Sequence, residues 1–278
     1  MKIIVTGSSG FIGKNLMEEF KNEAYELYGF SSKDGDICDQ QTWEKMPKVD
    51  VIIHLAAKTF VPDSWEEEKN FIEINSLSLL NAIKYCKKNN SRLIFLSSYI
   101  YGNSLNPLKE DSDISPSNPY ALSKLLAEEI CKFYKKTYKL DVIILRPFNV
   151  YGPYQNELFL IPKLIKQISD NKKIVVFDTL PKRDYIYIVD LINAIKKSIS
   201  YRGESYIFNI GTGKSYSVLE VINTLQKICK TNLPIETINK ERKMEIEDSI
   251  ADIDLAKREL LWHPEYSLEK AMKEFILV

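Results

Sequence analysis

The feature that most constrains the fold of this chain is a glycine-rich turn close to its start. The apolar run Ile3–Val5 leads into TGSSGFIG at residues 6–13, and an amphipathic segment near Phe11–Lys21 follows. A strand, turn and helix in this order make either a plain glycine turn or a seat for a diphosphate. In the second case Gly7 permits the tight turn, Gly10 lets the diphosphate approach the backbone, and Gly13 lets the helix pack closely on the sheet.

β-Branched runs alternate with amphipathic segments over the first half of the chain. This alternation predicts an α/β fold, a Rossmann-type doubly wound parallel sheet with helices on both faces. The expected strands are Lys2–Thr6, Glu26–Phe30, Val51–Leu55, Arg92–Ser97 and Val142–Arg146. The expected helices are Phe11–Lys21, Glu66–Asn89 and Pro119–Tyr138.

The pattern becomes less regular after Arg146, where the stretch RPFNVYGPYQN is rich in turn-forming residues. We expect residues 1–150 to form a nucleotide-binding domain and residues 151–278 to form mainly a smaller α/β substrate domain. Segments near 173–212 are expected to contribute to the first domain. The helices expected in this part are Leu158–Ser169, Val189–Ser200, Val218–Cys229, Asp252–Glu259 and Leu268–Phe275.

Composition excludes several classes of function. Lys and Arg number 38 and balance 38 Asp and Glu, so no strong net field attracts nucleic acid or an anionic membrane. The apolar runs are far shorter than the roughly 20 residues that span a bilayer, and no charged leader precedes the first strand. Two histidines, His54 and His263, offer little for a metal site. We expect a reduced cytoplasmic protein without a metal, with His54, Cys86 and Cys131 buried.

A second motif lies between the fourth expected strand and the helix that follows it. Ser97 ends the strand, and Tyr120 and Lys124 stand four residues apart in YALSK, on one face of the expected helix. A phenol is a poor acid–base group near pH 7, and a neighbouring ammonium favours its phenolate. A serine hydroxyl beside that phenol would hold a substrate oxygen. The alternative is a Tyr–Lys pair on a solvated helix face, and the glycine turn upstream argues against it.

With these motifs the chain resembles the extended short-chain dehydrogenase/reductases that modify nucleotide sugars. The matching motifs occur in the same order over nearly the whole chain: TGSSGFIG, GDICD (35–39), HLAA (54–57), LSSYIYG, PYALSK, RPFNVYGP (146–153), RDYIYIVD (183–190) and FNIGTG (208–213). The resemblance implies a Rossmann domain that binds NAD(P) and a smaller domain that closes over a nucleotide-diphosphate sugar. It also implies a homodimer with a four-helix interface. Apolar residues that either serve this interface or face the sheet are Leu79, Leu80, Ile83, Leu126, Ile130 and Phe133.

The resemblance implies a role for each matching residue. Tyr120 is the acid–base group, Lys124 holds the nicotinamide ribose and lowers the phenol pKa, and Ser97 binds the reacting oxygen. The residues implied in cofactor binding are Gly7, Gly10, Phe11, Ile12, Gly13, Ser31, Ser32, Lys33, Asp36, Ile37, Leu55, Ala56, Ala57, Asn75, Tyr120 and Lys124. The residues implied in substrate binding are Ser98, Tyr99, Asn149, Arg183 and Arg242.

Departures from the family pattern narrow the reaction. Sugar-nucleotide 4,6-dehydratases carry Asp-Glu directly after the reactive hydroxyl, where this chain has Ser98 and Tyr99. Tyr99 also stands where enzymes that epimerise at C3 and C5 have a Cys. Two reactions remain: reduction of the C4 keto group of a nucleotide-linked 6-deoxy sugar, which we favour, and NAD-dependent 4-epimerisation. A non-catalytic NAD(P)-binding sensor is a third alternative, and the intact Ser97, Tyr120 and Lys124 argue against it.

The end of the second expected strand favours NADP(H) over NAD(H). An acid at this place binds the adenosine ribose and repels a 2′-phosphate. This chain has Ser31, Ser32 and Lys33 there. Hydroxyls and an ammonium accommodate a 2′-phosphate, whereas Asp34 is an acid that would instead bind a ribose.

Overall fold

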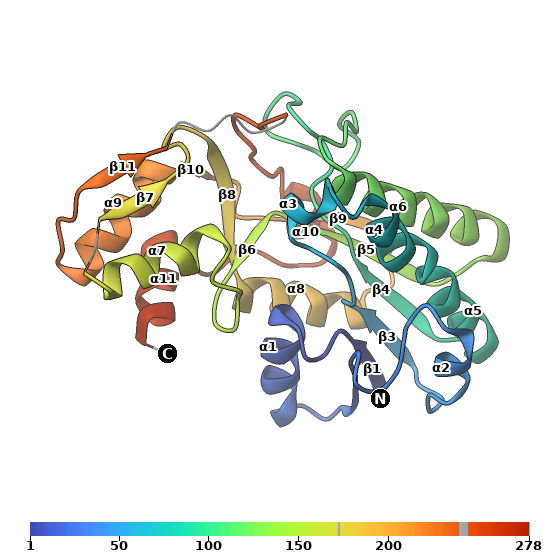
Figure 1. Ribbon diagram of the computed structural model, residues 1–278. Helices are drawn as coiled ribbons and strands as arrows, with labels where there is room; N and C mark the ends of the chain where they lie inside the picture. Colours follow the sequence, from blue (N-terminus) through green and yellow to red (C-terminus); the bar gives the residue numbers. More distant parts are fainter. Residues whose placement is uncertain (172, 239–243, 278) are drawn as a thin grey trace.

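The computed structural model describes residues 1–171, 173–238 and 244–277, and its centre is a parallel sheet (Figure 1). Six strands lie in the order β2-β1-β3-β4-β5-β9, and every neighbouring pair is parallel. The predicted α/β class is confirmed. The strands of this sheet are β1 (Lys2–Thr6), β2 (Glu26–Phe30), β3 (Val51–His54), β4 (Arg92–Leu96), β5 (Val142–Pro147) and β9 (Ile207–Ile210).

The central strands are buried on both faces, which explains their nearly continuous apolar sequences. Every residue of β3, β4 and β5 is buried. Because side chains alternate along a strand, Ile53 enters one hydrophobic core and Ile52 enters the other. Helices α1 (Phe11–Glu19) and α8 (Ile188–Ser200) close the first core, and α5 (Leu79–Asn89) and α6 (Pro119–Tyr138) close the second.

Local signals set the ends of α6 (Pro119–Tyr138), the helix that carries the Tyr–Lys motif. The Asn118 side chain accepts a hydrogen bond from the Ala121 amide (2.8 Å), and Pro119 fits the first turn. The helix ends at Lys139, which has a left-handed φ of 58°. Other helices are η1 (Phe20–Asn22), α2 (Gln40–Glu44), α3 (Val61–Ser64), α7 (Leu160–Ser169), α9 (Val218–Cys229), α10 (Asp254–Glu259) and α11 (Leu268–Leu277).

The segment Glu66–Asn89, expected as one helix, is interrupted. It consists of α4 (Glu68–Ile72), a π-helical turn η2 (Glu73–Leu77) and α5 (Leu79–Asn89). The π turn contains Asn75, whose buried side chain hydrogen-bonds to Lys58 and to α6. An extra residue in one turn aims this side chain inward, and apolar periodicity alone does not reveal such a turn.

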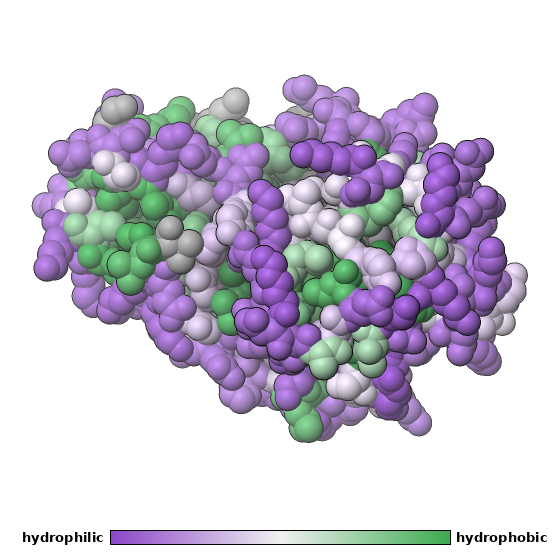
Figure 2. Space-filling model, turned by 90° about the horizontal axis from the view of Figure 1, so that it is seen from below, coloured by the Kyte–Doolittle hydropathy of each residue, from purple (hydrophilic) through white to green (hydrophobic). Residues whose placement is uncertain are grey.

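A smaller unit stands beside the sheet, on the left in Figure 1. Its three-stranded sheet has the order β10-β8-β6, and β7 and β11 form a separate parallel pair. The strands are β6 (Asn149–Tyr151), β7 (Ile174–Val176), β8 (Lys182–Tyr187), β10 (Ser215–Ser217) and β11 (Ile235–Thr237). Between them in sequence, β9 returns to the main sheet beside β5. Seen from below, much of the surface is hydrophilic, and hydrophobic side chains gather over the smaller unit and in patches near the centre of the molecule (Figure 2).

The burial predicted for three side chains can be compared with the structure. His54, Cys86 and Cys131 are buried, as predicted. Across the described stretches of the chain, no helix is both long and apolar enough to cross a membrane. Nor do the described residues hold a group of three or more His, Cys, Asp or Glu side chains arranged for a metal ion.

Candidate active site

The glycine turn between β1 and α1 leaves almost no room for side chains. Gly7 has a positive φ of 71°, and a Cβ there would lie 2.8 Å from the Ala56 amide nitrogen. A Cβ on Gly13 would lie 2.2 Å from the Gly7 carbonyl oxygen. The tight turn predicted at Gly7 is present, and Gly13 packs closely against Gly7 and Ser8 of the turn rather than against a strand. Gly10 begins α1, and no side chain in the described part caps that end, so its first amides suit an external anion.

The loop after β3 passes directly beside this turn. The Leu55 amide donates to the Thr6 carbonyl (3.2 Å), and the Ala56 amide donates to the Thr6 hydroxyl (3.3 Å). Asn75 accepts from the Lys58 amide (2.8 Å) and donates to the Lys58 carbonyl and the Ser123 hydroxyl (2.9 Å each). Both N–H groups of Asn75 are thus used within the protein, and its side chain fixes the loop that contains Leu55, Ala56 and Ala57 through Lys58.

The end of β2 presents charges of both signs. The Asp34 carboxylate accepts hydrogen bonds from the Ser31 amide (2.8 Å) and hydroxyl (2.7 Å). These hydrogen bonds lower the pKa of Asp34. Ser32 and Lys33 are exposed beside it. A carboxylate and an ammonium therefore stand together where the sequence predicts recognition of the adenosine ribose.

Asp36 and Ile37, which the family resemblance assigns to cofactor binding, lie on a loop fixed by hydrogen bonds. The Asp36 carboxylate accepts from the Cys38 amide (2.8 Å). The Ile37 carbonyl accepts from the Trp43 indole (2.9 Å) and from the Asn81 side chain (3.2 Å) of α5. The structure thus places Asp36 and Ile37 on an ordered loop that follows β2.

Tyr120 lies in the first turn of α6 and lines a cavity of about 400 Å³. Burial raises the pKa of its phenol to about 12, a hydrogen bond with the Ser98 side chain opposes the rise, and Tyr99 adds to it. The direction is opposite to the expected lowering by Lys124, whose Nζ lies 6.0 Å from the Tyr120 ring centroid. The phenol therefore keeps its proton near neutral pH, so it has a proton to give but does not accept one there.

Lys124 is 4% exposed, one helical turn beyond Tyr120. Burial lowers its pKa to about 8, and the charge of Glu128 opposes this effect. Its Nζ donates to the Leu96 carbonyl (2.9 Å) and lies 5.1 Å from the Phe95 ring centroid. The nearby His54 has its pKa lowered to about 3 by burial and by Lys124, so it is neutral. Lys124 is thus held against the end of β4 and remains mostly charged at pH 7.

Ser97 and Ser98 make different contacts. The Ser97 hydroxyl donates to Glu128 Oε1 (2.6 Å), whereas Ser98 is the serine whose side chain lies beside Tyr120 and opposes the rise of its pKa. Glu128 and Arg146 are both fully buried and form a two-pronged ion pair, with Arg146 Nε 2.9 Å from Oε1 and Nη2 2.6 Å from Oε2. The Ser97 hydroxyl, which the family resemblance assigns to the reacting oxygen, is thus held by Glu128 in this structure.

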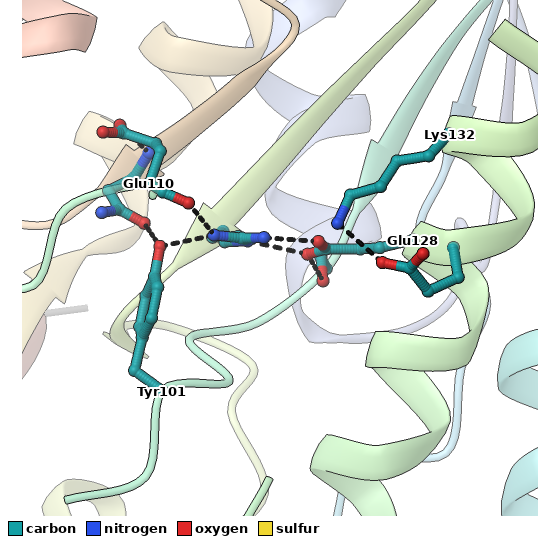
Figure 3. Close-up of polar contacts among 8 residues, drawn as sticks. Tyr101, Glu110, Glu128 and Lys132 are labelled. Carbon is teal, nitrogen blue, oxygen red and sulfur yellow. Dashed lines mark hydrogen bonds and ion pairs between the residues drawn. The ribbon is translucent and has the colours of Figure 1, made fainter. Parts of the chain in front are cut away.

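The buried network continues beyond Arg146 (Figure 3). Arg146 Nη1 donates to the Tyr101 hydroxyl (2.7 Å) and to the Glu110 carbonyl (2.9 Å). The Tyr101 hydroxyl donates in turn to the Asn209 side-chain oxygen (2.6 Å), and the backbone N–H of Asn209 donates to the Glu110 carboxylate (2.7 Å). These bonds join α6, β5, β9 and the loop after β4.

The cavity is lined by residues of both units, including Ser98 from the sheet and Phe159, Lys163 and Phe177 from the smaller unit. Tyr99 stacks on Phe148 in its wall, with centroids 5.0 Å apart and planes at 16°. The Tyr99 hydroxyl donates to Asn149 Oδ1 (3.3 Å). Asn149 Nδ2 is buried, and no atom of the described residues accepts its hydrogens.

Arg183, on β8, also lines this cavity. It donates to the backbone carbonyls of Lys182 (2.7 Å) and Ile246 (2.6 Å) and is ion-paired with Glu245. The structure therefore brings Arg183 and Asn149, both predicted to bind substrate, to the same cavity as Tyr99, Ser98 and Tyr120. Arg242, the remaining predicted substrate residue, lies outside the described residues.

Sequence reasoning missed two residues of the site, Glu128 and Arg146. A signal for Glu128 was present, because it follows Lys124 by four residues and Tyr120 by eight and so shares their helical face. Arg146 was predicted to end a strand, and its sequence position indicates no partner for its charge. Its ion pair with Glu128 depends on how α6 packs on β5, which one sequence does not specify.

The fold and the site together define a Rossmann-type dinucleotide-binding enzyme with a Tyr–Lys pair on the wall of a cavity between two units. The model of the NAD dependent epimerase/dehydratase family matches residues 3–211. The chain belongs to this family. It is an NAD(P)-dependent enzyme of the extended short-chain dehydrogenase/reductase type, among relatives that include nucleotide-sugar epimerases, dehydratases and reductases.

Similar proteins have several activities. A GDP-6-deoxy-D-mannose reductase of Pseudomonas aeruginosa is 30% identical over 257 residues, covering 84% of this chain and 82% of that protein. A putative UDP-glucose 4-epimerase of Methanocaldococcus jannaschii is 30% identical over 300 residues, covering 99% and 97%. A dTDP-D-glucose 4,6-dehydratase of Dictyostelium discoideum is 33% identical over 269 residues, covering 82% of this chain, and the match spans only 62% of that longer protein.

Solved structures of the same fold contain either dinucleotide. A UDP-glucose 4-epimerase from Thermotoga maritima, with UDP-glucose, has a TM-score of 0.93 at 26% identity and covers 100% of this chain and 98% of its own. RMD from Pseudomonas aeruginosa, complexed with NADPH, has a TM-score of 0.91 at 26% identity, covering 99% and 97%. A Bacillus cereus UDP-glucuronic acid 4-epimerase with UDP-glucuronic acid and NAD has a TM-score of 0.92 at 28% identity, covering 99% and 98%.

Proposed function

We propose that this enzyme reduces the C4 keto group of a nucleotide-linked 6-deoxy sugar. The observation that carries the proposal is the Tyr120 phenol, which lines the cavity beside Ser98 and has its pKa raised to about 12. Such a phenol is a proton donor at neutral pH, as reduction of a ketone requires. Tyr99, which occupies the place of a dehydratase carboxylate, is stacked on Phe148 and offers no carboxylate for the loss of water.

The residues present fit a dinucleotide. The uncapped start of α1 and the glycines before it would hold the diphosphate, and the loop of Leu55, Ala56 and Ala57 would follow its middle. When bound, the reduced nicotinamide supplies hydride. We propose NADPH as the form used, because Lys33 at the end of β2 attracts a 2′-phosphate, although Asp34 beside it opposes this attraction.

The chain's own part in the reaction is to hold and protonate the C4 oxygen. Ser98, beside Tyr120, orients that oxygen in our proposal, in the role that the sequence pattern assigns to Ser97. Tyr120 donates its phenolic proton to the oxygen as the carbonyl becomes a hydroxyl. The phenolate left behind is stabilised by the positive charge of Lys124, and solvent returns the proton.

Two polar residues of the cavity are proposed to bind the substrate's diphosphate. Asn149 Nδ2 is a buried donor in need of an acceptor, and Arg183 supplies a positive charge in the same wall. Arg242 is proposed for the same role from its sequence position alone. These residues suit any nucleoside diphosphate sugar, so they do not separate one nucleotide from another.

We further propose that two copies of the chain associate through α5 and α6. Leu122, Leu126 and Phe133 of α6 are 40%, 38% and 57% exposed and lie along one side of the helix. Leu79 and Ile83 of α5 are instead fully buried against the sheet. The outer apolar stripe of α6 is therefore available to a second copy.

Turnover of defined sugar nucleotides tests the proposed function. Purified enzyme is incubated with 4-keto-6-deoxy sugar nucleotides and NADPH, and the loss of absorbance at the reduced nicotinamide band is followed. We expect stoichiometric oxidation of NADPH, which Tyr120→Phe abolishes while leaving dinucleotide binding intact. Interconversion of C4 epimers with no net oxidation of added cofactor would instead identify the 4-epimerase, and tight dinucleotide binding with no turnover would identify a sensor.

A further inference from the structure

We infer that Glu128 is a positioning residue of the active site. Its carboxylate accepts hydrogen bonds from both Arg146 and the Ser97 hydroxyl, and it follows Lys124 by one helical turn on the same face of α6. Through these contacts it fixes the end of β4 from which the active-site groups project, and it supplies the negative charge that faces Lys124. Only the expected effect of Glu128 variants on turnover rests on the proposed function.

The first part of the argument is geometric. Residues 96–98 lie at the end of β4, and each lies against α6. The Leu96 carbonyl accepts from Lys124 (2.9 Å), the Ser97 hydroxyl donates to Glu128 (2.6 Å), and the Ser98 side chain lies beside Tyr120. Ser97 is therefore the middle of three consecutive residues that lie against α6. If Glu128 did not hold Ser97, we expect Leu96 and Ser98 to shift relative to Lys124 and Tyr120.

The Glu128 carboxylate is held in place by the Arg146 guanidinium, which is itself fixed by four hydrogen bonds. Two go to the carboxylate, and the others go to the Tyr101 hydroxyl (2.7 Å) and the Glu110 carbonyl (2.9 Å). Figure 3 shows Glu128 on one side of this guanidinium and Tyr101 and Glu110 on the other. A carboxylate bound in two-pronged fashion has a fixed orientation, so its Oε1 presents a fixed acceptor to Ser97.

The second part of the argument is electrostatic. Lys124 faces Tyr120 and Glu128 on its own helix, the neutral His54 of β3, and the Leu96 carbonyl and Phe95 ring of β4. Arg146 of β5 lies beyond Glu128. Among these described neighbours, Glu128 is the one anion, and its charge raises the pKa of Lys124 against the lowering by burial. Without this charge, Lys124 would lose its proton at lower pH and could no longer stabilise a phenolate.

The decisive experiment measures Lys124 directly. The protein is labelled with ¹³C at lysine Cε, and the Lys124 signal is identified by its absence in Lys124→Met. In Glu128→Gln we expect the pKa of Lys124, about 8 in the parent, to fall by about one unit or more. The matched control is Glu129→Gln, because Glu129 is 58% exposed and pairs with Lys132 on the surface. In that variant the pKa of Lys124 is expected to stay unchanged.

A folded Glu128→Gln protein with an unshifted Lys124 would overturn the electrostatic part of the inference. Glu128→Asp tests the geometric part, and it serves alone if Glu128→Gln does not fold. Aspartate keeps the charge but withdraws the carboxylate from Ser97 by one methylene. We expect an unshifted Lys124 and turnover lowered by about ten- to a hundredfold; parental turnover would overturn this part. The titration requires no substrate, so an absence of keto-sugar reduction would refute the proposed function without deciding the role of Glu128.

Discussion

The Glu128–Arg146 pair allows a quantitative prediction about stability. Both side chains are fully buried, and Arg146 makes four hydrogen bonds, two of them to the carboxylate. Arg146→Met leaves an uncompensated carboxylate in the interior, and Glu128→Gln leaves an uncompensated guanidinium. Removal of one partner from a buried pair destabilises a protein by about 3–5 kcal/mol. At about 2–4 °C per kcal/mol for a chain of this size, each single variant should unfold about 6–20 °C below the parent.

The double variant distinguishes this reasoning from a simple loss of contacts. With both charges removed, the pair leaves no uncompensated charge in the interior. We expect the double variant to be more stable than either single variant, with a coupling energy of about 2–4 kcal/mol in a double-mutant cycle followed by circular dichroism. Lys132→Met, which removes an exposed ion pair with Glu129, is the control and should cost less than about 1 kcal/mol. Additive losses in the double variant would refute the buried-charge argument.

Three further predictions concern cofactor, stability and assembly. Lys33→Ala should weaken NADPH binding relative to NADH about three- to tenfold, and Asp34→Ala should strengthen it similarly, as measured by nicotinamide fluorescence titration. Lys124→Met should abolish turnover yet stabilise the fold at pH 7 by about 2–3 kcal/mol in urea unfolding, because burial lowers the pKa of Lys124 from 10.5 to about 8. The unfolded state binds more protons between these values, so the stability of the parent rises with pH and this difference should vanish above about pH 10.5. Leu126→Arg should convert a dimer into a monomer, with mass measured by light scattering.

The main sheet could be predicted because its strands are buried on both faces. A strand such as β4 reads as a continuous apolar run, and the helix between β4 and β5 is long and well capped, so both leave clear sequence signals. Predicted bounds for β1, β2 and α6 coincide with those observed, and β3 and β4 are each one residue shorter than predicted. The π turn at Asn75 left no such signal, because a single extra residue in a helical turn hardly changes the apolar pattern.

The smaller unit was harder to predict because its strands are short and partly exposed. The strands β6 and β10 have three residues each and do not show alternation long enough to distinguish them from loops. The middle strand β8 coincides with a family motif, and no alternation of polar and apolar residues revealed it as a strand. Long-range polar contacts were equally hidden: Arg146 meets Glu128 because β5 packs on α6, and Arg183 meets Glu245 across 62 positions of sequence.

The two serines at the end of β4 provide the sharpest test of the site. The sequence pattern assigns the reacting oxygen to Ser97, whereas the structure gives the Ser97 hydroxyl to Glu128 and leaves Ser98 beside Tyr120. A hydroxyl that donates to a buried carboxylate has no proton left for a substrate oxygen. We therefore expect Ser98→Ala to lower kcat about a hundredfold and Ser97→Ala to lower it about tenfold or less, with dinucleotide affinity unchanged in both. The reverse order of the two effects, measured in the NADPH oxidation assay with matched protein stability, would return the catalytic role to Ser97.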